Sequence, residues 1–324
     1  MILGAQNKGK AAALALFSVA VASAQDAIVK TMAGTYPAYE TVMIRTITAL
    51  PALLVMLMVF GGGLKSLRTP LLGWIFFRGL VLCSAYFGFI LSIAAMPIAN
   101  AVAIYFTMPF FVAMLSGRFL NEQVPLHRWL AIAAAFIGVL IMVRPFGGMG
   151  GDKDIFAAAC ALYSALGYAA GQMMGRALSQ RVDPLVITNV QNLTYLIVAL
   201  LLFALVSITG VHLETNKSLA FLTRAFVWPT QHDFLVLAGM GFLSSIAAMS
   251  FTWAYKLGEA SFVAPFEYSA MIWAVSYGLI LFNDFPDKWT WTGMAIVVLA
   301  GLYMMEQDRK RRVHITTADS PTNP

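Results

Sequence analysis

The chain has 324 residues, of which 60% are hydrophobic and 11% are charged. In soluble domains about a quarter of the residues are charged, so this composition excludes a soluble globular protein and indicates a polytopic membrane protein. The net charge of +6 could suggest nucleic-acid binding, but the lysines and arginines stand mostly singly between apolar runs. This spacing is typical of residues that set membrane topology, so we expect no nucleic-acid partner.

Cysteine and histidine, the residues most often used for disulfides and metal sites, are sparse. Cys83 and Cys160 both lie inside apolar segments, which supports no disulfide framework. The histidines are scattered over expected loops and the C-terminal tail without the spacing of metal ligands, at His127, His212, His232 and His314. We therefore expect neither a metal nor a cofactor.

Runs of about 20 apolar residues, the length that crosses a bilayer as a helix, recur along the whole chain. In chain order they cover residues 11–31, 37–60, 71–95, 98–117, 127–143, 155–179, 184–209, 233–255, 261–282 and 288–305. The sequence thus predicts an all-α membrane protein with ten transmembrane helices.

The basic residues are distributed unevenly between the two sets of connecting segments. If the N-terminus is cytoplasmic, most lysines and arginines outside the spans fall on the cytoplasmic side, including the cluster at residues 309–312. Cytoplasmic loops carry such an excess of positive charge. We therefore expect both termini in the cytoplasm and the protein in a bacterial inner membrane.

The first span could belong to a removable signal peptide. Lys8 and Lys10 precede an apolar run, and residues 22–24 (Ala-Ser-Ala) resemble a cleavage site. The alternative is a retained membrane helix that continues through Asp26 and Lys30, where charges are costly.

An internal repeat decides between these alternatives. The residues FLNE at 119–122, followed by Trp129, recur as LFND at 281–284, followed by Trp291. The counterpart of the first span is the segment at 164–176, in the middle of the chain, where no signal peptide can stand. The first span is therefore expected to be retained.

The repeat also sets the domain organisation. The first repeat covers residues 10–145 and the second covers 153–306, each with five spans. Because five is odd, the second repeat enters the membrane from the opposite side, which gives two inverted five-helix repeats of the kind found in secondary transporters. The polar, basic tail at 307–324 is expected to be disordered and cytoplasmic. In the long connection at 210–232, the segment SLAFLTRAFVW predicts a short helix that rests at the membrane interface or acts as a lid.

Two segments carry a resemblance to a known family. Residues 78–145, beginning RGLVLCSAYFGF, resemble the first repeat of the drug/metabolite transporter superfamily, EamA type, and residues 254–284, AYKLGEASFVAPFEYSAMIWAVSYGLILFND, resemble the second. The resemblance implies ten helices, alternating access, and a central cavity walled by the third, fourth, eighth and ninth helices with contributions from the first and sixth. Members move amino acids, riboflavin, S-adenosylmethionine, nucleosides, sugars and drugs. Both repeats here end in Asn-acidic pairs, at 121–122 and 283–284, where many members have Gly-Glu; we expect this difference to affect only a helix-end loop.

Charged residues inside the predicted spans form two groups by depth. Asp26 and Arg45 lie about 8 and 12 Å below the outer surface at 1.5 Å per residue, with Lys30 and Glu40 shallower. Structural pairing of Asp26 and a gating or substrate role are both open. Lys30 is expected to extend toward the lipid headgroups.

A second group is expected about 10 Å from the cytoplasmic surface. It holds Arg78 and Glu267, together with Gln172 and Asn192, the repeat counterparts of Asp26 and Arg45. Arg78 is expected to recognise an anionic substrate or to neutralise Glu267. The two groups are predicted to act as alternating gates, and proton uptake by an acidic member could couple transport to the proton gradient.

Aromatic residues on the cavity helices offer stacking surfaces for a planar substrate. With the charged residues they give the candidate substrate and gating set: Asp26, Lys30, Arg45, Arg78, Tyr105, Gln172, Trp253, Glu267, Tyr268 and Trp273. Two prolines, Pro109 and Pro265, are expected to interrupt the helices that hold them. The GxxxGxxxG pattern from Gly167 to Gly175 predicts close helix packing within the bundle or, as a second reading, in a dimer.

The predicted function is secondary active transport of a small metabolite by alternating access, with the protein as a monomer or homodimer. No GxxxxGK[ST] phosphate loop is present, which argues against ATP-driven pumping by this chain. The alternatives are an accessory membrane protein and a membrane-embedded enzyme. The enzyme is disfavoured because no histidine lies in the interior of a predicted span; His127 stands at the first residue of its span.

Overall fold

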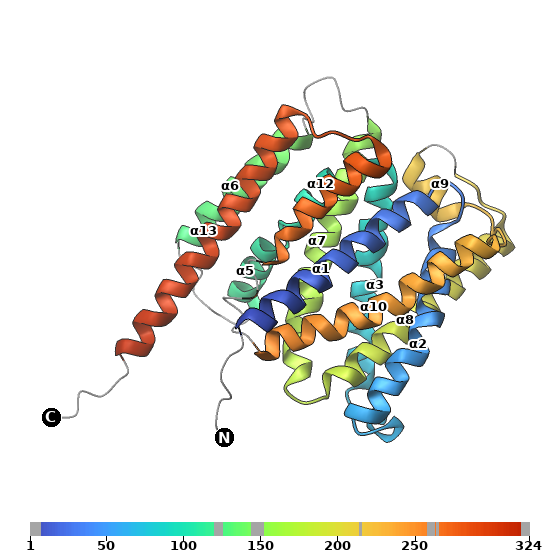
Figure 1. Ribbon diagram of the computed structural model, residues 1–324, viewed down its shortest axis with the longest axis horizontal. Helices are drawn as coiled ribbons and strands as arrows, with labels where there is room; N and C mark the ends of the chain where they lie inside the picture. Colours follow the sequence, from blue (N-terminus) through green and yellow to red (C-terminus); the bar gives the residue numbers. More distant parts are fainter. Residues whose placement is uncertain are drawn as a thin grey trace.

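The computed structural model describes residues 8–119, 126–143, 152–213, 216–257 and 266–318, together with Val263. Within these ranges the regular structure is helical (Figure 1). The elements are α1 (Lys8–Met32), α2 (Ala38–Phe60), the short 3-10 helix η1 (Leu64–Leu67), α3 (Leu72–Ala95), α4 (Ile98–Tyr105), α5 (Met108–Phe119), α6 (Leu126–Val143), α7 (Asp152–Ser179), α8 (Pro184–Thr209), α9 (Lys217–Thr223), α10 (Gln231–Leu257), α12 (Ser269–Phe282) and α13 (Lys288–Ala318).

Six helices in the described ranges are long and apolar enough to cross a membrane. They are Gly9–Met32, Ala38–Phe60, Leu72–Ala95, Ile155–Ser179, Pro184–Thr209 and Gln231–Phe251. Shorter apolar helices cover Ile98–Val112, Trp129–Met142 and Ser269–Phe282. The expected class, an all-α membrane protein, is therefore confirmed.

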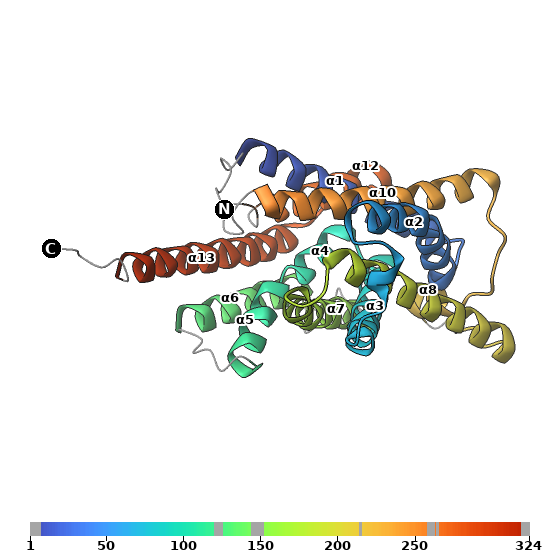
Figure 2. The same cartoon turned by 90° about the horizontal axis from the view of Figure 1, so that it is seen from below.

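The helices pack in antiparallel pairs that join the two halves of the chain. The most extensive contacts are α3 with α7, α6 with α13, α1 with α10 and α2 with α8 (Figures 1 and 2). In the α1–α10 pair, the Ser18 hydroxyl donates to the Ala247 carbonyl at 2.8 Å, while Ala11 and Ala15 pack with Ala254. Residues nearer the start of α1 therefore contact residues nearer the end of α10, so the two helices are antiparallel.

The predicted span at 98–117 consists of two helices, α4 and α5, separated at Phe106 and Thr107. Pro109 has no N–H to donate to the carbonyl of Tyr105, so the regular helix cannot continue through this point. The Thr107 N–H instead donates a hydrogen bond to the Ile104 carbonyl at 3.0 Å. The expected interruption at Pro109 is confirmed, whereas Pro265 lies outside the described residues.

The last helix extends farther than expected. α13 continues to Ala318, so residues 307–318 are helical where a disordered tail was expected. Glu306 and Lys310, one turn apart, are 3.8 Å from each other and favour the helical conformation across this boundary. Residues 319–324 lie outside the described ranges.

The predicted short helix in the long connection is present as α9. Asn216 caps its start by accepting from the Ser218 N–H at 2.9 Å. The helix does not simply rest at an interface: Phe221 is fully buried, and the Ser218 hydroxyl donates to the Leu91 carbonyl at 2.7 Å. We call the end of the bundle where α9 packs on α3 the α9 end.

Candidate functional site

Arg45 lies in α2 where that helix crosses α10 at close range. Gly241 of α10 faces the backbone carbonyl of Arg45 and the side chain of Thr48, and a Cβ at this position would collide with both. The close crossing fixes the backbone of α2 at Arg45. Its side chain is partly buried among residues of the neighbouring helices.

The Arg45 guanidinium lies over the ring of Tyr86 on α3, 4.3 Å from the ring centroid. Tyr86 in turn packs with Tyr195 on α8, with ring centroids 5.9 Å apart. Arginine stacked on an aromatic face gains cation–π attraction while its N–H donors remain in the plane of the group. The stack therefore orients Arg45 and leaves its edge available.

Two further tyrosines complete the surroundings. Tyr105 at the end of α4 meets Tyr168 of α7 edge to face, with centroids 5.3 Å apart, and also packs against Phe89. Asp26 of α1 interacts electrostatically with Arg45 and with Tyr105. We call this set the central polar cluster; its members are Asp26, Arg45, Tyr86, Tyr105, Tyr168 and Tyr195.

The charged members of the cluster lack partners among the described residues. Asp26 and Arg45 interact over a distance too long for an ion pair, and neither side chain makes a hydrogen bond within the described ranges. In the same ranges, the fully buried side-chain polar atoms without a hydrogen-bond partner belong to Glu40, Ser164, Asn189 and Ser269. The polar atoms of Asp26 and Arg45 are not among them, so these atoms keep some accessible surface.

An unpaired carboxylate or guanidinium in an apolar interior costs several kcal/mol at least. Asp26 and Arg45 are half-buried and not sealed, so their polar atoms keep some accessible surface that lowers this cost. The arrangement offers a negative acceptor, a positive donor and aromatic walls to water or to a polar solute. Among the described residues, no group of three His, Cys, Asp or Glu side chains is gathered as a metal ion would require.

Lys30 does not extend toward the membrane surface, contrary to the prediction. Its ammonium group pairs with Asp284 at 2.9 Å, donates to the Met96 carbonyl at 3.1 Å and lies 4.7 Å from the centroid of the Phe282 ring. The side chain is only 13% exposed. Inward-facing partners at the α9 end therefore outweigh solvation by headgroups.

Asp284 owes its position to the residue before it. Asn283 ends α12 in the left-handed conformation (φ 54°), which glycine and asparagine adopt most readily. The Asp284 N–H then bonds to the Gly278 carbonyl at 2.9 Å, and its carboxylate faces Lys30. The Asn-acidic pair thus supplies an ion pair between the two halves of the chain, rather than affecting a loop alone. Its counterpart at 121–122 lies outside the described residues.

Glu40 is bound to a backbone group of the long connection. Its Oε2 accepts from the Val227 N–H at 3.2 Å, and the segment after α9 is held further by Arg224, which donates to the Ala33 carbonyl at 2.9 Å. Tyr39 donates to the Arg224 carbonyl at 3.0 Å. Glu40 therefore anchors the long connection and does not face Lys30.

Arg78 is held by α7 and α8 instead of Glu267. Its Nε donates to the Gly171 carbonyl at 2.9 Å, and its Nη1 donates to Gln191 at 2.8 Å. Gly175 leaves room for the guanidinium, since a Cβ there would lie 2.8 Å from Nε. Neutralisation of Glu267 was one of two expected roles of Arg78, and the hydrogen bonds described for Arg78 instead join three helices.

The remaining candidates are spread around the cluster. Glu267 interacts electrostatically with Tyr105 and Tyr268, which places it beside the cluster. Tyr268 stacks on Phe106 with centroids 4.8 Å apart, and its hydroxyl packs at Gly301 of α13.

Three candidates are exposed. Gln172 on α7 and Trp253 on α10 are exposed, and Trp273 on α12 is exposed while stacking on Tyr277 of the same helix. The structure brings none of the three into the central polar cluster.

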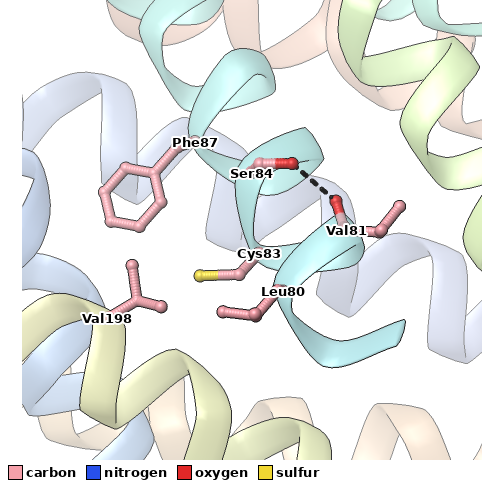
Figure 3. A pocket seen from close by; sticks show the side chains of 6 residues that line it. All are labelled: Leu80, Val81, Cys83, Ser84, Phe87 and Val198. Atoms are coloured by element: carbon pink, nitrogen blue, oxygen red, sulfur yellow. Dashed lines mark hydrogen bonds between the residues drawn. The ribbon is translucent and has the colours of Figure 1, made fainter. Parts of the chain in front are cut away.

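A separate groove lies between α3 and α8 (Figure 3). It has a volume of about 400 Å³ and is lined by Leu80, Val81, Cys83, Ser84, Phe87 and Val198. The Ser84 hydroxyl donates to the Val81 carbonyl at 2.8 Å, so it offers the groove no free donor. An apolar groove between two membrane helices suits lipid chains better than a polar solute, and we place the functional site at the central polar cluster.

Tyr86, Tyr168 and Tyr195 belong to the cluster but were not among the residues predicted from the sequence. Each lies inside an apolar span, where a tyrosine needs a partner or an accessible space for its hydroxyl. That requirement was the available signal. It could not reveal that the three rings point to the same place.

Opposite, unpaired charges inside the helix bundle of a membrane protein are typical of transport proteins, because such charges are costly unless they serve a solute pathway. The chain belongs to the EamA-like transporter family, whose pattern it matches over residues 9–144 and 155–305. It is thus an integral membrane protein and a transporter of small metabolites, not an enzyme.

Several relatives are named as transporters. A riboflavin transporter from Rhizobium johnstonii is 30% identical over 220 residues, which cover 68% of this chain and 66% of the relative. An S-adenosylmethionine uptake transporter from Rickettsia conorii is 22% identical over 91% of this chain and 92% of its own. A pseudopaline exporter from Pseudomonas aeruginosa is 27% identical over 89% and 93%, respectively.

A solved crystal structure shares the fold. It covers 92% of this chain and 97% of its own, with a TM-score of 0.58 and 16% sequence identity. This likeness concerns the arrangement of helices alone.

Proposed function

We propose that the protein is a secondary transporter that moves a small metabolite by alternating access through the central polar cluster. The observation that carries the proposal is the pair Asp26 and Arg45, two opposite charges that interact electrostatically yet have no hydrogen-bond partner in the described ranges. A transporter must bind its solute away from both membrane surfaces, and such a site needs polar groups that water can reach. The relatives' names give riboflavin, S-adenosylmethionine and pseudopaline as the first solutes to test.

We further propose ten membrane helices in two inverted repeats. The packing supports this proposal because α1, α2, α3 and α6 of the first half each pair antiparallel with a helix of the second half. For α2 and α8, for example, Asn192 donates to the Thr46 carbonyl and Asn189 to the Leu53 carbonyl, at 3.0 and 3.2 Å. Equivalent helices of two inverted repeats run in opposite directions, as α2 and α8 and α6 and α13 do here, while α1 with α10 and α3 with α7 pair crosswise between the first and third helices of the repeats.

The expected topology has both termini in the cytoplasm. In a Cys83→Ala/Cys160→Ala background, Thr35→Cys between α1 and α2 should react with an impermeant maleimide added to whole cells. Lys65→Cys between α2 and α3 should react only after permeabilisation. Both residues are exposed, so access to the reagent decides the result. The reverse pattern would refute the proposed orientation, and labelling of both sites in intact cells would refute the spanning of α2.

Transport itself is tested by counterflow in proteoliposomes loaded with candidate metabolites. Asp26→Asn and Arg45→Lys should each lower the rate about tenfold or more, because a charged hydrogen bond to substrate contributes about 1.5–3 kcal/mol. Gln172→Ala is the matched control, since Gln172 is exposed on α7 and lies outside the cluster. Unchanged rates and unchanged pH dependence in both cluster variants would contradict the assignment of the transport site.

Coupling to protons is part of the same proposal. Asp26 and Glu267 are the acidic residues that interact electrostatically with Tyr105 of the central polar cluster. If one of them carries a proton across, uptake driven by a pH gradient should disappear in Asp26→Asn or Glu267→Gln, and the counterflow that remains in that variant should not depend on pH. Full retention of gradient-driven uptake in both variants would exclude this coupling.

A further inference from the structure

The connection between α8 and α10 packs across α2, α3 and the turn between α1 and α2, so it covers the α9 end of the bundle (Figure 1). We infer that its residues 216–230, here called the strap, lock this end closed, with Glu40 and Arg224 as the latch that releases when the end opens. The inference rests on the proposed alternating access, because a transporter of that kind needs a gate at each end of its pathway.

The start of the strap is fastened to α3. The Ser218 side chain is fully buried, and its hydroxyl donates to the Leu91 carbonyl at 2.7 Å. Phe221, one turn later in α9, is also fully buried and belongs to the main hydrophobic core. A helix of seven residues is not stable by itself, so these contacts with the bundle hold α9 in place.

The middle of the strap is fastened to the turn between α1 and α2. Arg224 Nη1 donates to the Ala33 carbonyl at 2.9 Å, and the Arg224 carbonyl accepts from the hydroxyl of Tyr39 at 3.0 Å. The ring of Tyr39 packs with Phe203 of α8, which packs in turn with Phe226 of the strap. Arg224 thus makes one charge-assisted bond as a donor and one bond as an acceptor to the first half of the chain.

Glu40 holds the next part of the strap. It is fully buried in the first turn of α2, and its Oε2 accepts from the Val227 N–H at 3.2 Å. Its Oε1 is buried too and has no hydrogen-bond partner among the described residues. A buried polar atom without a partner costs free energy, and this cost disappears when the group meets water. Glu40 therefore stabilises the closed strap through one oxygen and favours its release through the other.

The end of the strap reaches the turn between α1 and α2 as well. The Thr230 N–H donates to the Tyr36 hydroxyl at 3.3 Å. That hydroxyl donates to Asp233 in the first turn of α10 at 2.6 Å. A single hydroxyl of the turn is therefore bound to both the strap and α10.

The attachments of the strap described above share one property, because each joins it to an element of the first half of the chain. They are made by Ser218, Arg224, Val227 and Thr230. Lys30 and Asp284 join the two halves at the same end. Opening at this end separates the halves there, so the strap has to lift as the ion pair breaks. The rival is a strap that stays in place throughout transport as static packing.

The first test measures how well the closed strap protects a thiol. In a Cys83→Ala/Cys160→Ala background, Ser218→Cys places one reporter thiol between α9 and α3. The purified full-length chain in detergent is treated with a maleimide, and the labelling rate is measured. The rate reports the equilibrium between the closed and the lifted strap, because a buried thiol reacts only when it becomes exposed.

Arg224→Met and Glu40→Ala each remove one latch bond, so each should speed labelling about tenfold or more. Glu40→Gln keeps an acceptor for the Val227 N–H and should label no faster than the parent protein. Lys217→Met is the matched control, because Lys217 is an exposed cation on α9 beside the reporter, and it should leave the rate unchanged. If one latch variant fails to give a monodisperse protein, the other decides.

The second test holds the strap in place. Leu91→Cys is added to Ser218→Cys, because the contact of 2.7 Å between the two residues brings both thiols within reach of a short bifunctional thiosulfonate. Counterflow in proteoliposomes is measured with riboflavin, S-adenosylmethionine and pseudopaline. A solute that is exchanged before the reaction should stop exchanging once the bridge has formed and should resume after reduction. The two single-cysteine proteins, treated in the same way, show the effect of the reagent without a bridge.

Two results would overturn the inference: unchanged labelling in both Arg224→Met and Glu40→Ala, or full counterflow across the bridged strap. The first would mean that these bonds do not hold the strap, and the second that the strap stays in place during transport. Either result leaves the transport proposal standing. Absence of counterflow with every solute before bridging would reject the transport proposal, and the labelling rates would then decide by themselves whether the strap is latched.

Discussion

Lys30 on α1 and Asp284 after α12 form an ion pair of 2.9 Å that connects residues 254 positions apart in the chain. The pair sits at the α9 end, where Lys30 also bonds to the Met96 carbonyl. It therefore joins the end of α1, the end of α3 and the end of α12 at one point. Alternating access requires one end of the bundle to open, and these contacts would have to break for opening at the α9 end.

The first prediction concerns the strength of this pair. Lys30 and Asp284 are 13% and 34% exposed, so a double-mutant cycle of Lys30→Met and Asp284→Asn should give a coupling energy of about 1–3 kcal/mol in thermal or denaturant unfolding. The matched control is Glu306→Gln with Lys310→Met, a pair 3.8 Å apart with exposures of 43% and 65%. That pair should couple by about 0.5 kcal/mol or less. Equal coupling energies in the two cycles would argue against a role of Lys30 in holding the α9 end closed.

The second prediction tests the glycine face of α7. A Cβ at Gly167 would lie 2.7 Å from the Cβ of Ala85 on α3, so Gly167→Ala should force the helices apart and destabilise the protein by about 1–3 kcal/mol. Gly239→Ala on α10 is the control, because nothing lies within 4 Å of the position that its added methyl group would take. It should be neutral or stabilise by up to about 1 kcal/mol, since alanine favours helix.

The two glycine variants are compared by their melting temperatures in one detergent. A Gly167→Ala protein as stable as Gly239→Ala would show that α3 and α7 can separate without cost. The α7 glycines are used within the chain against α3, which supports close packing inside the bundle as the role of the GxxxGxxxG pattern.

The third prediction concerns Arg78. Arg78→Met removes the donors to Gly171 and Gln191 and should lower the free energy of unfolding by about 1.5–3 kcal/mol. Arg78→Lys keeps the charge but cannot reproduce the two-pronged contact, so it should fall between the wild type and Arg78→Met. Arg68→Met, at an exposed arginine in the α2–α3 connection, should stay within about 0.5 kcal/mol of the wild type. If Arg78→Met lowered transport without lowering stability, a substrate role would replace this structural one.

The sequence predicted what depends on local pattern. Apolar runs located the six long helices that can cross a membrane, and Pro109 marked the break between α4 and α5 because its missing N–H has the same effect in any helix. Pairing across the chain was not predictable in the same way. Lys30 was placed at the headgroups by its depth, but Asp284 offers a closer and better oriented partner than water does.

The central polar cluster shows the same limit. Asp26, Arg45 and Tyr105 were identified from their residue types, but depth alone cannot say which way a side chain points around its helix. Gln172 occupies the repeat position of Asp26 and is exposed, while Tyr168, four residues earlier on the same helix, joins the cluster. The rotation of each helix is set by packing contacts such as that of Gly241 with α2, which no single segment encodes.

The last prediction concerns Tyr36 in the turn between α1 and α2. This side chain is 1% exposed; its hydroxyl donates to Asp233 at 2.6 Å and accepts from the Thr230 N–H at 3.3 Å. The hydrogen bond to Asp233, together with burial, raises the pKa of Tyr36 above its ordinary value near 10. A raised pKa means that the folded state favours the neutral hydroxyl, so its stabilisation is complete below the pKa of the unfolded chain and is lost as the pH rises through the folded pKa.

The wild type should therefore melt at a higher temperature than Tyr36→Phe at pH 8, and the difference should shrink steadily as the pH is raised above about 10. Groups other than Tyr36 titrate in both proteins, so subtracting the two melting curves isolates the tyrosine. A difference that stays constant up to about pH 11.5 would mean that Tyr36 has the same pKa in the folded and the unfolded chain, and it would contradict the pKa shift assigned to the hydrogen bond with Asp233.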